Sequence, residues 1–427
     1  MAGAELHCAS TYANQLLADL GSNVRLPARA EAHPALRWAA SGSMYLTGFP
    51  DAPPQMCPVP LASYADGVLA ALAALGPAGA LAGVDGARLL GERAALAGYR
   101  RAGDVAPGGA CRLLRAADGY LALNLARAED WELLPAWLEA EGLSGWEEVA
   151  VALRTRDVHS CVVRGRLLGL ALAAAEVPRS GGVTAWYREL QAGQRAAPRA
   201  THAPRVIDLS SLWAGPLCAQ LLQQLGAQVT KVESLHRPDG LRASGTGFYQ
   251  LLNRDKQSLP LDFTTAAGRA ELRQLLLGAD LVIEASRPRA LRQLGIHAEE
   301  ILAARPGLTW LAISGHGREE PEGSWVAFGD DAAVAGGLSE VLWEGSGRMM
   351  FCGDAIADPL TGLHAALAAW CTYLRGGGRL LSIALRDVVA HAVRSAALGD
   401  AAASRARMQA WADRIAAADI AAPAARA

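Results

Sequence analysis

Residues 205–233 read RVIDLSSLWAGPLCAQLLQQLGAQVTKVE, and this stretch decides the fold. A short apolar strand over 205–209 leads through the loop SSLWAG into a segment with apolar residues at helical spacing, which ends at Gly226. A second apolar strand, QVTKVE, follows directly. Strands that alternate with helices predict a parallel sheet covered on both faces.

The same alternation continues toward residue 395. A helix is expected over 265–277 and short helices around 290–305. Further apolar strands are expected at 259–263, 281–285, 308–314 and 379–385. Because crossovers between parallel strands are right-handed, the pattern predicts a doubly wound, Rossmann-like sheet domain.

Asp358 and Pro359 precede a long apolar helix that ends at Gly376-Gly377-Gly378. An Asp before a Pro predicts a helix N-cap, with the proline at the first helical position. Free amides and the positive end of a helix also favour an ionised carboxylate, and beside a cleft such a group can act as a nucleophile. Capping and catalysis are both open for Asp358.

The first ninety residues contain a partial repeat of the sheet domain. A shift of 205 aligns residues 6–26 with 211–231, and a shift of 295 aligns 39–75 with 334–370. The second block matches Cys57 to Cys352 and places a serine opposite Asp358. We interpret residues 1–90 as a trimmed, degenerate copy, and the serine implies one active copy.

Residues 91–190 have a different pattern. Two alternating stretches flank the turn Ala117-Asp118-Gly119, which predicts a β-hairpin. Helices are expected over 131–140 and 165–175, so this region is predicted to be a small α+β domain. The remaining boundaries are a linker over 191–204, the sheet domain over 205–395 and a helical tail over 396–427.

Composition excludes several classes of protein. The 427 residues suffice for two or three domains, and 40 basic against 42 acidic side chains give a net charge of −2. That charge argues against nucleic acid or a membrane surface as a partner. No apolar run reaches the length of a membrane span, and no secretory signal is apparent. A cytoplasmic location is therefore expected. Seven scattered cysteines without C-x-x-C spacing predict reduced core residues and no metal site.

Common catalytic motifs are also absent from the sequence. The loop SSLWAG contains neither G-x-G-x-x-G nor a P-loop lysine, which argues against NAD and ATP enzymes. Ser314 lacks the glycine two residues earlier that a nucleophile elbow requires. His316 and His364 stand alone, without the paired spacing of a zinc site.

The whole set of motifs resembles the family III CoA-transferases, of the formyl-CoA transferase and carnitine CoA-transferase type. The resemblance rests on 205–233 followed in order by NRDKQSLPLDF, GRAELRQLLLGADLVIEASRP, LGI, LAISGHG and IADPLTGLHAALAAW. The segment GGACRLLRAADGYLALNLARAEDW resembles the second domain of the family, which normally follows the sheet domain and here precedes it.

The resemblance implies that Asp358 is the nucleophilic aspartate. It would form an aspartyl anhydride with an acyl group and then an aspartyl-CoA thioester, so that CoA passes from an acyl-CoA to a carboxylic acid. CoA would be a substrate and not a tightly bound cofactor. The residues that the resemblance places near CoA are Leu212, Trp213, Ala214, Lys256, Arg237, Gly108 and Gly109.

Several positions depart from the family pattern. Ser234 stands where a basic residue is common, which moves the expected phosphate contact to Arg237. Ala285 and Ser286 replace an Asn-Phe pair of the CoA pocket. An inactive CoA-binding or scaffolding relative is therefore an alternative. An acyl-CoA racemase is less favoured, because Gly329-Asp330-Asp331 stands where racemases have Gly-His-Asp.

Assembly is also expected to follow the family. Its members interlace two subunits, so that a small domain lies over each active site. We expect a homodimer in which the small domain packs near Asp358, either from its own chain or from its mate, with Gly108 and Gly109 as a shortened glycine-rich loop. Lys256 remains open to a second interpretation, as an ordinary solvated surface charge.

Overall fold

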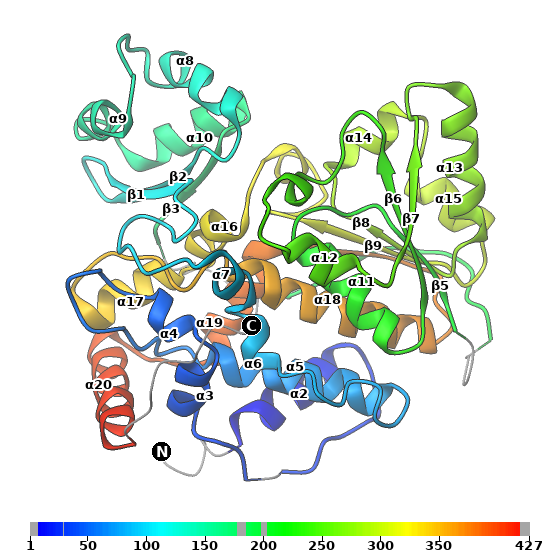
Figure 1. Ribbon diagram of the computed structural model, residues 1–427, viewed down its shortest axis with the longest axis horizontal. Helices are drawn as coiled ribbons and strands as arrows, with labels where there is room; N and C mark the ends of the chain where they lie inside the picture. Colours follow the sequence, from blue (N-terminus) through cyan, green and yellow to red (C-terminus); the bar gives the residue numbers. More distant parts are fainter. Residues whose placement is uncertain (1–6, 29, 177–184, 198–202, 419–427) are drawn as a thin grey trace.

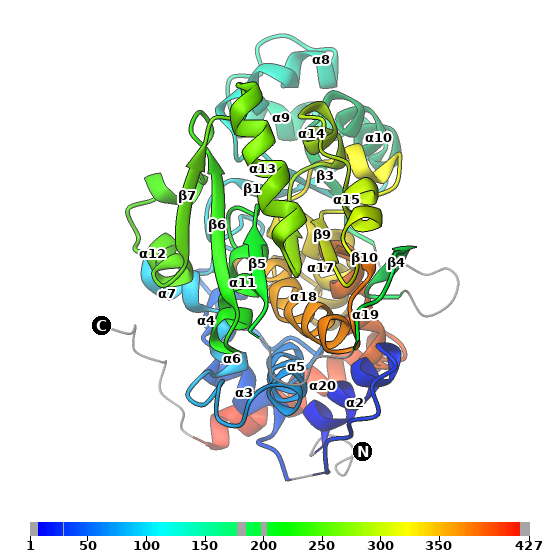
Figure 2. The same ribbon diagram turned by 90° about the vertical axis from the view of Figure 1, so that its right-hand side faces the viewer.

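The computed structural model describes residues 7–28, 30–176, 185–197 and 203–418. Within these ranges, six strands of the C-terminal half pair in parallel. They are β5 (Arg205–Asp208), β6 (Gln228–Ser234), β7 (Gln257–Leu261), β8 (Leu281–Glu284), β9 (Thr309–Ser314) and β10 (Arg379–Ala384). Their order, β7-β6-β5-β8-β9-β10, is the 3-2-1-4-5-6 order of a doubly wound fold, which confirms the expected class (Figure 2).

A seventh strand corrects the expected linker. Strand β4 (Arg188–Ala192) pairs antiparallel with β10 at the sheet edge. Beyond it, the backbone N–H groups of Gly193 and Ala196 donate to the carbonyls of Gly378 and Gly376. Residues 191–196 are thus part of the sheet domain, because an edge strand offers unpaired backbone groups that a passing chain can satisfy. Residues 198–202 of the expected linker lie outside the described ranges.

Helices cover both faces of the sheet (Figure 1). Val206 and Ile207 of β5 point into two different apolar cores, as expected for a parallel strand buried on both sides. One face carries α11 (Ala214–Gln224), α12 (Phe248–Asn253) and α18 (Ala357–Leu374). The other carries α13 (Ala266–Gly278), α14 (Pro288–Gln293) and α15 (Ala298–Ala304).

The helices of the N-terminal region align with helices of the sheet domain at the two sequence shifts, 205 and 295. Shifting by 205 brings α2 (Cys8–Asp19) onto α11. Shifting by 295 brings α3 (Pro34–Ala40), α4 (Ser43–Leu46) and α5 (Leu61–Leu75) onto α16 (Gly329–Ala335), α17 (Leu338–Ser346) and α18. Helix α2 packs on α5 as α11 packs on α18, and α5 packs on α18. The aligned helices α5 and α18 therefore pack directly against each other.

The cysteines matched by the shift of 295 also meet. A hydrogen bond with Cys57, together with burial, raises the pKa of the Cys352 thiol well above its usual value. Equivalent residues come into contact where two copies are related by a twofold axis. Residues 57 and 352, which the shift of 295 aligns, thus lie at the contact between the N-terminal segment and the sheet domain.

The small domain has three antiparallel strands, β1 (Cys111–Arg115), β2 (Tyr120–Asn124) and β3 (Ala171–Ala174). The hairpin between β1 and β2 is confirmed. The helix expected over 165–175 is wrong: α10 (Val158–Leu168) ends at Gly169, which has a φ of 87°, and the apolar residues after it form β3. A short apolar run cannot be assigned to helix or strand from its periodicity. Other helical segments are η1 (Ala128–Leu133), α8 (Leu134–Leu138) and α9 (Trp146–Leu153).

The C-terminal helix packs against the body of the protein. Helix α20 (Ala401–Ala417) contacts α17 and α3, with Met408 and Trp411 buried. The last expected residues of the tail, 419–427, lie outside the described ranges. The other segments are α6 (Gly86–Leu89), α7 (Glu92–Ala97), α19 (Leu385–Ser395), η2 (Gly240–Ala243) and η3 (Glu322–Ser324). Among the described residues, none of the helices has the length and apolar character needed to cross a membrane.

Candidate active site

Asp358 is the second residue of α18, and the structure corrects its expected role as an N-cap. The helix begins at Ala357, Ile356 occupies the cap position, and no side chain caps it. The carboxylate of Asp358 instead accepts a hydrogen bond from the backbone N–H of Ala214, the first residue of α11. Ligands of doubly wound folds bind at this carboxyl-terminal end of the strands.

Gly329, the first residue of α16, forms a wall of the site. An ideal Cβ at Gly329 would lie within 3.0 Å of Oδ2 of Asp358, and it would lie 2.5 Å from the carbonyl oxygen of Ala355. Real Cβ atoms do not make such close contacts. The position of the Asp358 carboxylate therefore requires glycine at residue 329.

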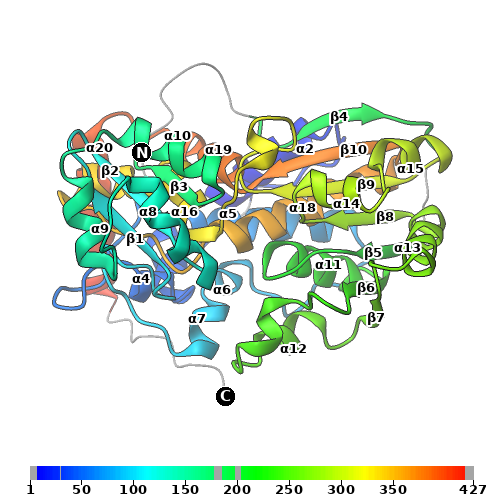
Figure 3. The same ribbon diagram turned by 90° about the horizontal axis from the view of Figure 1, so that it is seen from above.

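The carboxylates of Asp330 and Asp354 and the guanidinium group of Arg93 lie close to Gly329 and Asp358. Asp330 accepts a hydrogen bond of 2.7 Å from the backbone N–H of Ala355. Asp354 is fully buried and accepts two hydrogen bonds from Arg93, of 2.8 Å from Nε and 2.6 Å from Nη2. Arg93 comes from α7, which lies beside α12 when the molecule is seen from above (Figure 3).

The charges in this cluster change the ionisation of its members. Burial raises the pKa of Asp358 to about 7, Arg93 opposes the rise, and Asp330 and Asp354 add to it. Burial, with Asp354 nearby, also raises the pKa of Asp330 to about 6. Near neutral pH, Asp358 is therefore divided between its protonated and ionised forms. Such a perturbed carboxyl group is typical of a functional site.

The loop after β5 has a strained backbone. Leu212 has a φ of 66°, which is uncommon for a residue with a side chain, and its N–H donates to both carboxylate oxygens of Asp239 at 3.2 Å. Trp213 is buried edge-on against Phe248, with ring centroids 5.1 Å apart. This fixed loop presents the N–H of Ala214 to Asp358.

Comparison with known proteins places the chain in a family. Residues 203–422, more than half of the chain, match the model described as CoA-transferase family III. The chain belongs to the family III CoA-transferases. This confirms the resemblance seen in the motifs.

Two curated relatives illustrate the match. The succinyl-CoA--D-citramalate CoA-transferase of Chloroflexus aurantiacus is 34% identical over 179 residues, covering 40% of this chain and 44% of the relative. The succinate--glutarate CoA-transferase of Agrobacterium fabrum is 31% identical over 201 residues, covering 43% and 50%. This family III chain therefore spans about half the length of the curated relatives it matches. A solved CAIB/BAIF family protein from Brucella suis is 29% identical, with 44% and 53% coverage and a TM-score of 0.39.

Lys256 of this family III protein lies next to the loop that joins β5 to α11, and its ammonium group is buried. Nζ donates to Asp208 at 3.0 Å, to Asn253 at 2.9 Å and to the carbonyl of Pro216 at 2.8 Å. An ammonium group has three protons, so all of them are used within the protein. Burial opposes ionisation of Asp208, but Lys256 and Lys231 outweigh it and lower the pKa of Asp208 to about 2. Lys256 is thus neither a solvated charge nor a free phosphate ligand here.

Replacing Lys256 by alanine is therefore expected to destabilise the fold. Removing one partner of a buried ion pair leaves an uncompensated charge, so the free energy of unfolding should fall by about 3–5 kcal/mol. Urea denaturation measures the change. The exposed Arg254→Ala serves as the matched control and should change stability by less than about 0.5 kcal/mol. A Lys256→Ala protein as stable as the control would contradict the buried role.

The other expected CoA residues are placed differently. Arg237 is exposed in the turn after β6. Gly108 lies near the cluster, because a Cβ there would be 3.7 Å from Nη2 of Arg93 and 3.7 Å from the Tyr99 ring. Gly109 has a φ of 82°, and nothing lies within 4 Å of the position that a Cβ would take there. The structure thus brings Gly108 close to Arg93, and Arg237 has no described contact with either.

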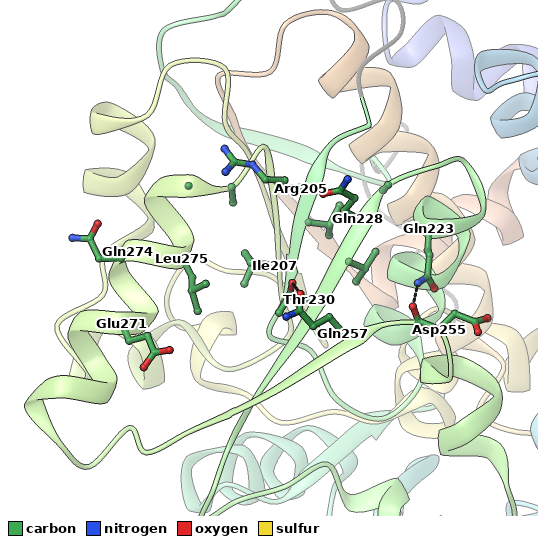
Figure 4. Close-up of a pocket in the computed structure, with 15 residues that line it drawn as sticks. Arg205, Ile207, Gln223, Gln228, Thr230, Asp255, Gln257, Glu271, Gln274 and Leu275 are labelled. Carbon is green, nitrogen blue, oxygen red and sulfur yellow. Dashed lines mark hydrogen bonds between the residues drawn. The ribbon is translucent and has the colours of Figure 1, made fainter.

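A hollow of about 640 Å³ lies at the opposite end of the sheet. Figure 4 shows residues that line it. It is lined by the first residues of β5 and β6, such as Arg205 and Gln228, and by Glu271 and Gln274 of α13. Because the Asp358 site lies beyond the last residues of these strands, the hollow is not part of it. The carboxylate cluster and this hollow are thus separate features of the sheet domain.

Arg93, Asp354 and Asp330 were not recognised from the sequence. The segment GERAAL around Arg93 matches no motif, and an isolated arginine reads as a surface residue. Asp354 and Asp330 gave a weak signal, since each lies next to a glycine, Asp354 just before an apolar helix and Asp330 in the first turn of one. The side chains meet because residues far apart in the chain fold together, which local patterns do not reveal.

Proposed function

We propose that this family III protein transfers CoA between an acyl-CoA thioester and a carboxylic acid, with Asp358 as the nucleophile. The observation that carries the proposal is the half-enclosed Asp358 carboxylate, fixed between Gly329 and the N–H of Ala214 with a pKa near neutrality. A carboxylate that is ionised at neutral pH yet more basic than usual is a better nucleophile. The two relatives described above bear the names of dicarboxylic acids, so small dicarboxylic acids are the proposed substrate class.

The proposed steps conserve the thioester energy. The Asp358 carboxylate attacks the thioester carbonyl, the C–S bond breaks, and an aspartyl anhydride and CoA thiolate form. The thiolate attacks the aspartyl carbonyl, which releases the first acid and leaves an aspartyl-CoA thioester. The acceptor carboxylate attacks that thioester and forms a second anhydride with release of thiolate. Thiolate then attacks the acceptor carbonyl, giving the new acyl-CoA and free Asp358.

The surrounding residues have supporting roles in the proposal. The N–H of Ala214 donates toward charge at Asp358, and the start of α11 adds a favourable dipole. Leu212 and Trp213 form the surface along which CoA lies. Arg237, Gly108 and Gly109 are proposed contacts farther along CoA, and Lys256 acts by holding the loop. CoA is the substrate, and these steps require no tightly bound cofactor.

Covalent capture of an intermediate tests the proposal. The protein is incubated with succinyl-CoA, digested, and analysed by mass spectrometry for an adduct on the peptide that contains Asp358. CoA exchange is measured in parallel with succinate, glutarate and citramalate as acceptors. The expected result is exchange together with an adduct on this peptide. Exchange with an adduct elsewhere, or neither in the presence of measurable CoA binding, would overturn the mechanism.

An inactive CoA-binding relative is the second candidate. Ala285 and Ser286, which follow β8, provide neither the amide nor the ring expected of a CoA pocket. In that case calorimetry would detect CoA binding, while the capture experiment would give no exchange and no adduct.

We also propose a cytoplasmic homodimer. The small domain of the same chain already lies against the sheet domain, where Asn124 donates to Asp331 of α16 at 2.9 Å. Large apolar side chains remain exposed on α9 and α10, with Leu167 82% exposed and Val151 68% exposed. An interface between copies would cover them. Light scattering at micromolar concentration should give twice the mass of 44.6 kDa, and a stable monomer would contradict this prediction.

A further inference from the structure

Arg93 is held in one orientation beside the nucleophile. Its two hydrogen bonds to Asp354 fix the plane of the guanidinium group. The Cζ atom of Arg93 lies 5.3 Å from the ring centroid of Trp213 and 5.9 Å from that of Tyr99. A paired and stacked guanidinium group cannot be replaced by a flexible ammonium without loss of geometry.

The guanidinium group of Arg93 is the cation that interacts with the carboxylates of Asp330, Asp354 and Asp358. The charged groups that act on Asp358 are Asp330 from α16, Asp354 from the turn before α18, and Arg93 from α7. Asp331, the next residue of α16, accepts hydrogen bonds from the side-chain amide of Asn124 and from the backbone N–H of Phe328. Helix α11 contributes a backbone N–H and no charged side chain at this point. Three carboxylates thus share one cation.

We propose that Arg93 is a positioning residue for CoA transfer: it holds the turn before α18 in place and keeps Asp358 ionised for attack. This inference rests on the proposed function. Arg93 lies on α7, which comes before strand β1 in the chain, so a segment outside the C-terminal sheet domain supplies a component of the site at Asp358. Asp358 without this contribution would be a poor nucleophile at neutral pH, because nearby negative charges disfavour its ionised form.

The test compares the pH dependence of transfer in four variants. Arg93→Gln removes the charge, Arg93→Lys keeps it, and the double variant Arg93→Gln with Asp354→Asn neutralises both partners. Arg88→Gln is the matched control, because Arg88 is a mostly exposed arginine on the neighbouring α6, 3.8 Å from Asp85. Transfer should rise with pH as Asp358 ionises, with a midpoint near 7 in the natural protein.

Arg93→Gln is expected to move this midpoint upward by about one pH unit. The ionised fraction at pH 7 then falls from about one half to about one tenth, which is about a fivefold loss of rate that recovers toward pH 9. Arg93→Lys should restore part of the shift. The double variant should return the midpoint toward that of the natural protein, since it removes one charge of each sign. Arg88→Gln should leave both rate and midpoint unchanged.

A uniform fall in rate at every pH, with an unchanged midpoint, would overturn the proposal and leave Arg93 a purely structural role. Infrared difference titration of the Asp358 carboxyl band, identified by its absence in Asp358→Asn, reads the ionisation of Asp358 without turnover. If the natural protein shows no transfer, the proposed function fails, while the effect of Arg93 on this titration is still measured. If Arg93→Gln does not fold, the double variant and Arg93→Lys decide the outcome.

Discussion

Replacing Asp358 by asparagine is expected to reduce CoA transfer by at least about 10³-fold, because the amide cannot form the aspartyl anhydride. The amide oxygen can still accept the hydrogen bond from Ala214, so the shape of the site should persist. Transfer is measured as CoA exchange, and the adduct on the Asp358 peptide should disappear. Activity above about 1% of the natural protein would remove Asp358 from the mechanism.

The same variant should be more stable than the natural protein at pH 8. The pKa of Asp358 is about 7 in the folded state and about 3.9 in an unfolded chain, so folding favours the protonated form. The stability that protonated Asp358 contributes to the folded protein is therefore lost as pH rises from about 4 to about 7. The full shift corresponds to about 4 kcal/mol, and partial exposure of the side chain reduces our expectation to about 1–3 kcal/mol.

Urea denaturation at two pH values separates the effect of the Asp358 carboxylate on stability from a change in stability that does not depend on pH. The difference between Asp358→Asn and the natural protein should be small at pH 4, where the carboxyl group is protonated in the folded state and only about half ionised in the unfolded chain. It should reach its full value at pH 8. Equal stability of the two proteins at pH 8 would show that the carboxylate is not held in an unfavourable environment.

Replacing Gly329 by alanine should also abolish most activity, although residue 329 carries no functional group. The new Cβ would overlap Oδ2 of Asp358 and the carbonyl oxygen of Ala355, so the carboxylate must move. A displacement of about 1 Å at a reacting group can cost about 10²-fold in rate, which is the loss we expect. Overpacking should lower the free energy of unfolding by about 1–3 kcal/mol.

Gly278→Ala is the matched control for this substitution. Gly278 ends α13, and the nearest atom to a Cβ there is Nη1 of Arg205, at 3.8 Å. The control should retain activity. If Gly329→Ala kept normal transfer, the α16 wall would not define the position of Asp358. If both variants lost activity, the loss could not be assigned to the site.

Part of the site was predictable from the sequence. Asp358 stands out because it lies at the start of a long apolar stretch within a family motif, and Leu212, Trp213 and Ala214 follow a clear strand. The structure joins these two elements through the hydrogen bond between Ala214 and Asp358. The burial of Lys256 was not predictable, because a lysine in a polar loop has no pattern that distinguishes a solvated from a paired ammonium group.

The sequence by itself determined the six parallel strands, the family and the nucleophile candidate, because buried parallel strands are continuous apolar runs and the motifs follow in order. Only the tertiary structure decided that Ala171–Ala174 is a strand, that residues 188–192 pair with β10, and that Arg93 reaches Asp354. The physical reason is range. Periodicity and capping act within a few residues, whereas an edge pairing or a buried ion pair depends on which distant segments the packed helices bring together.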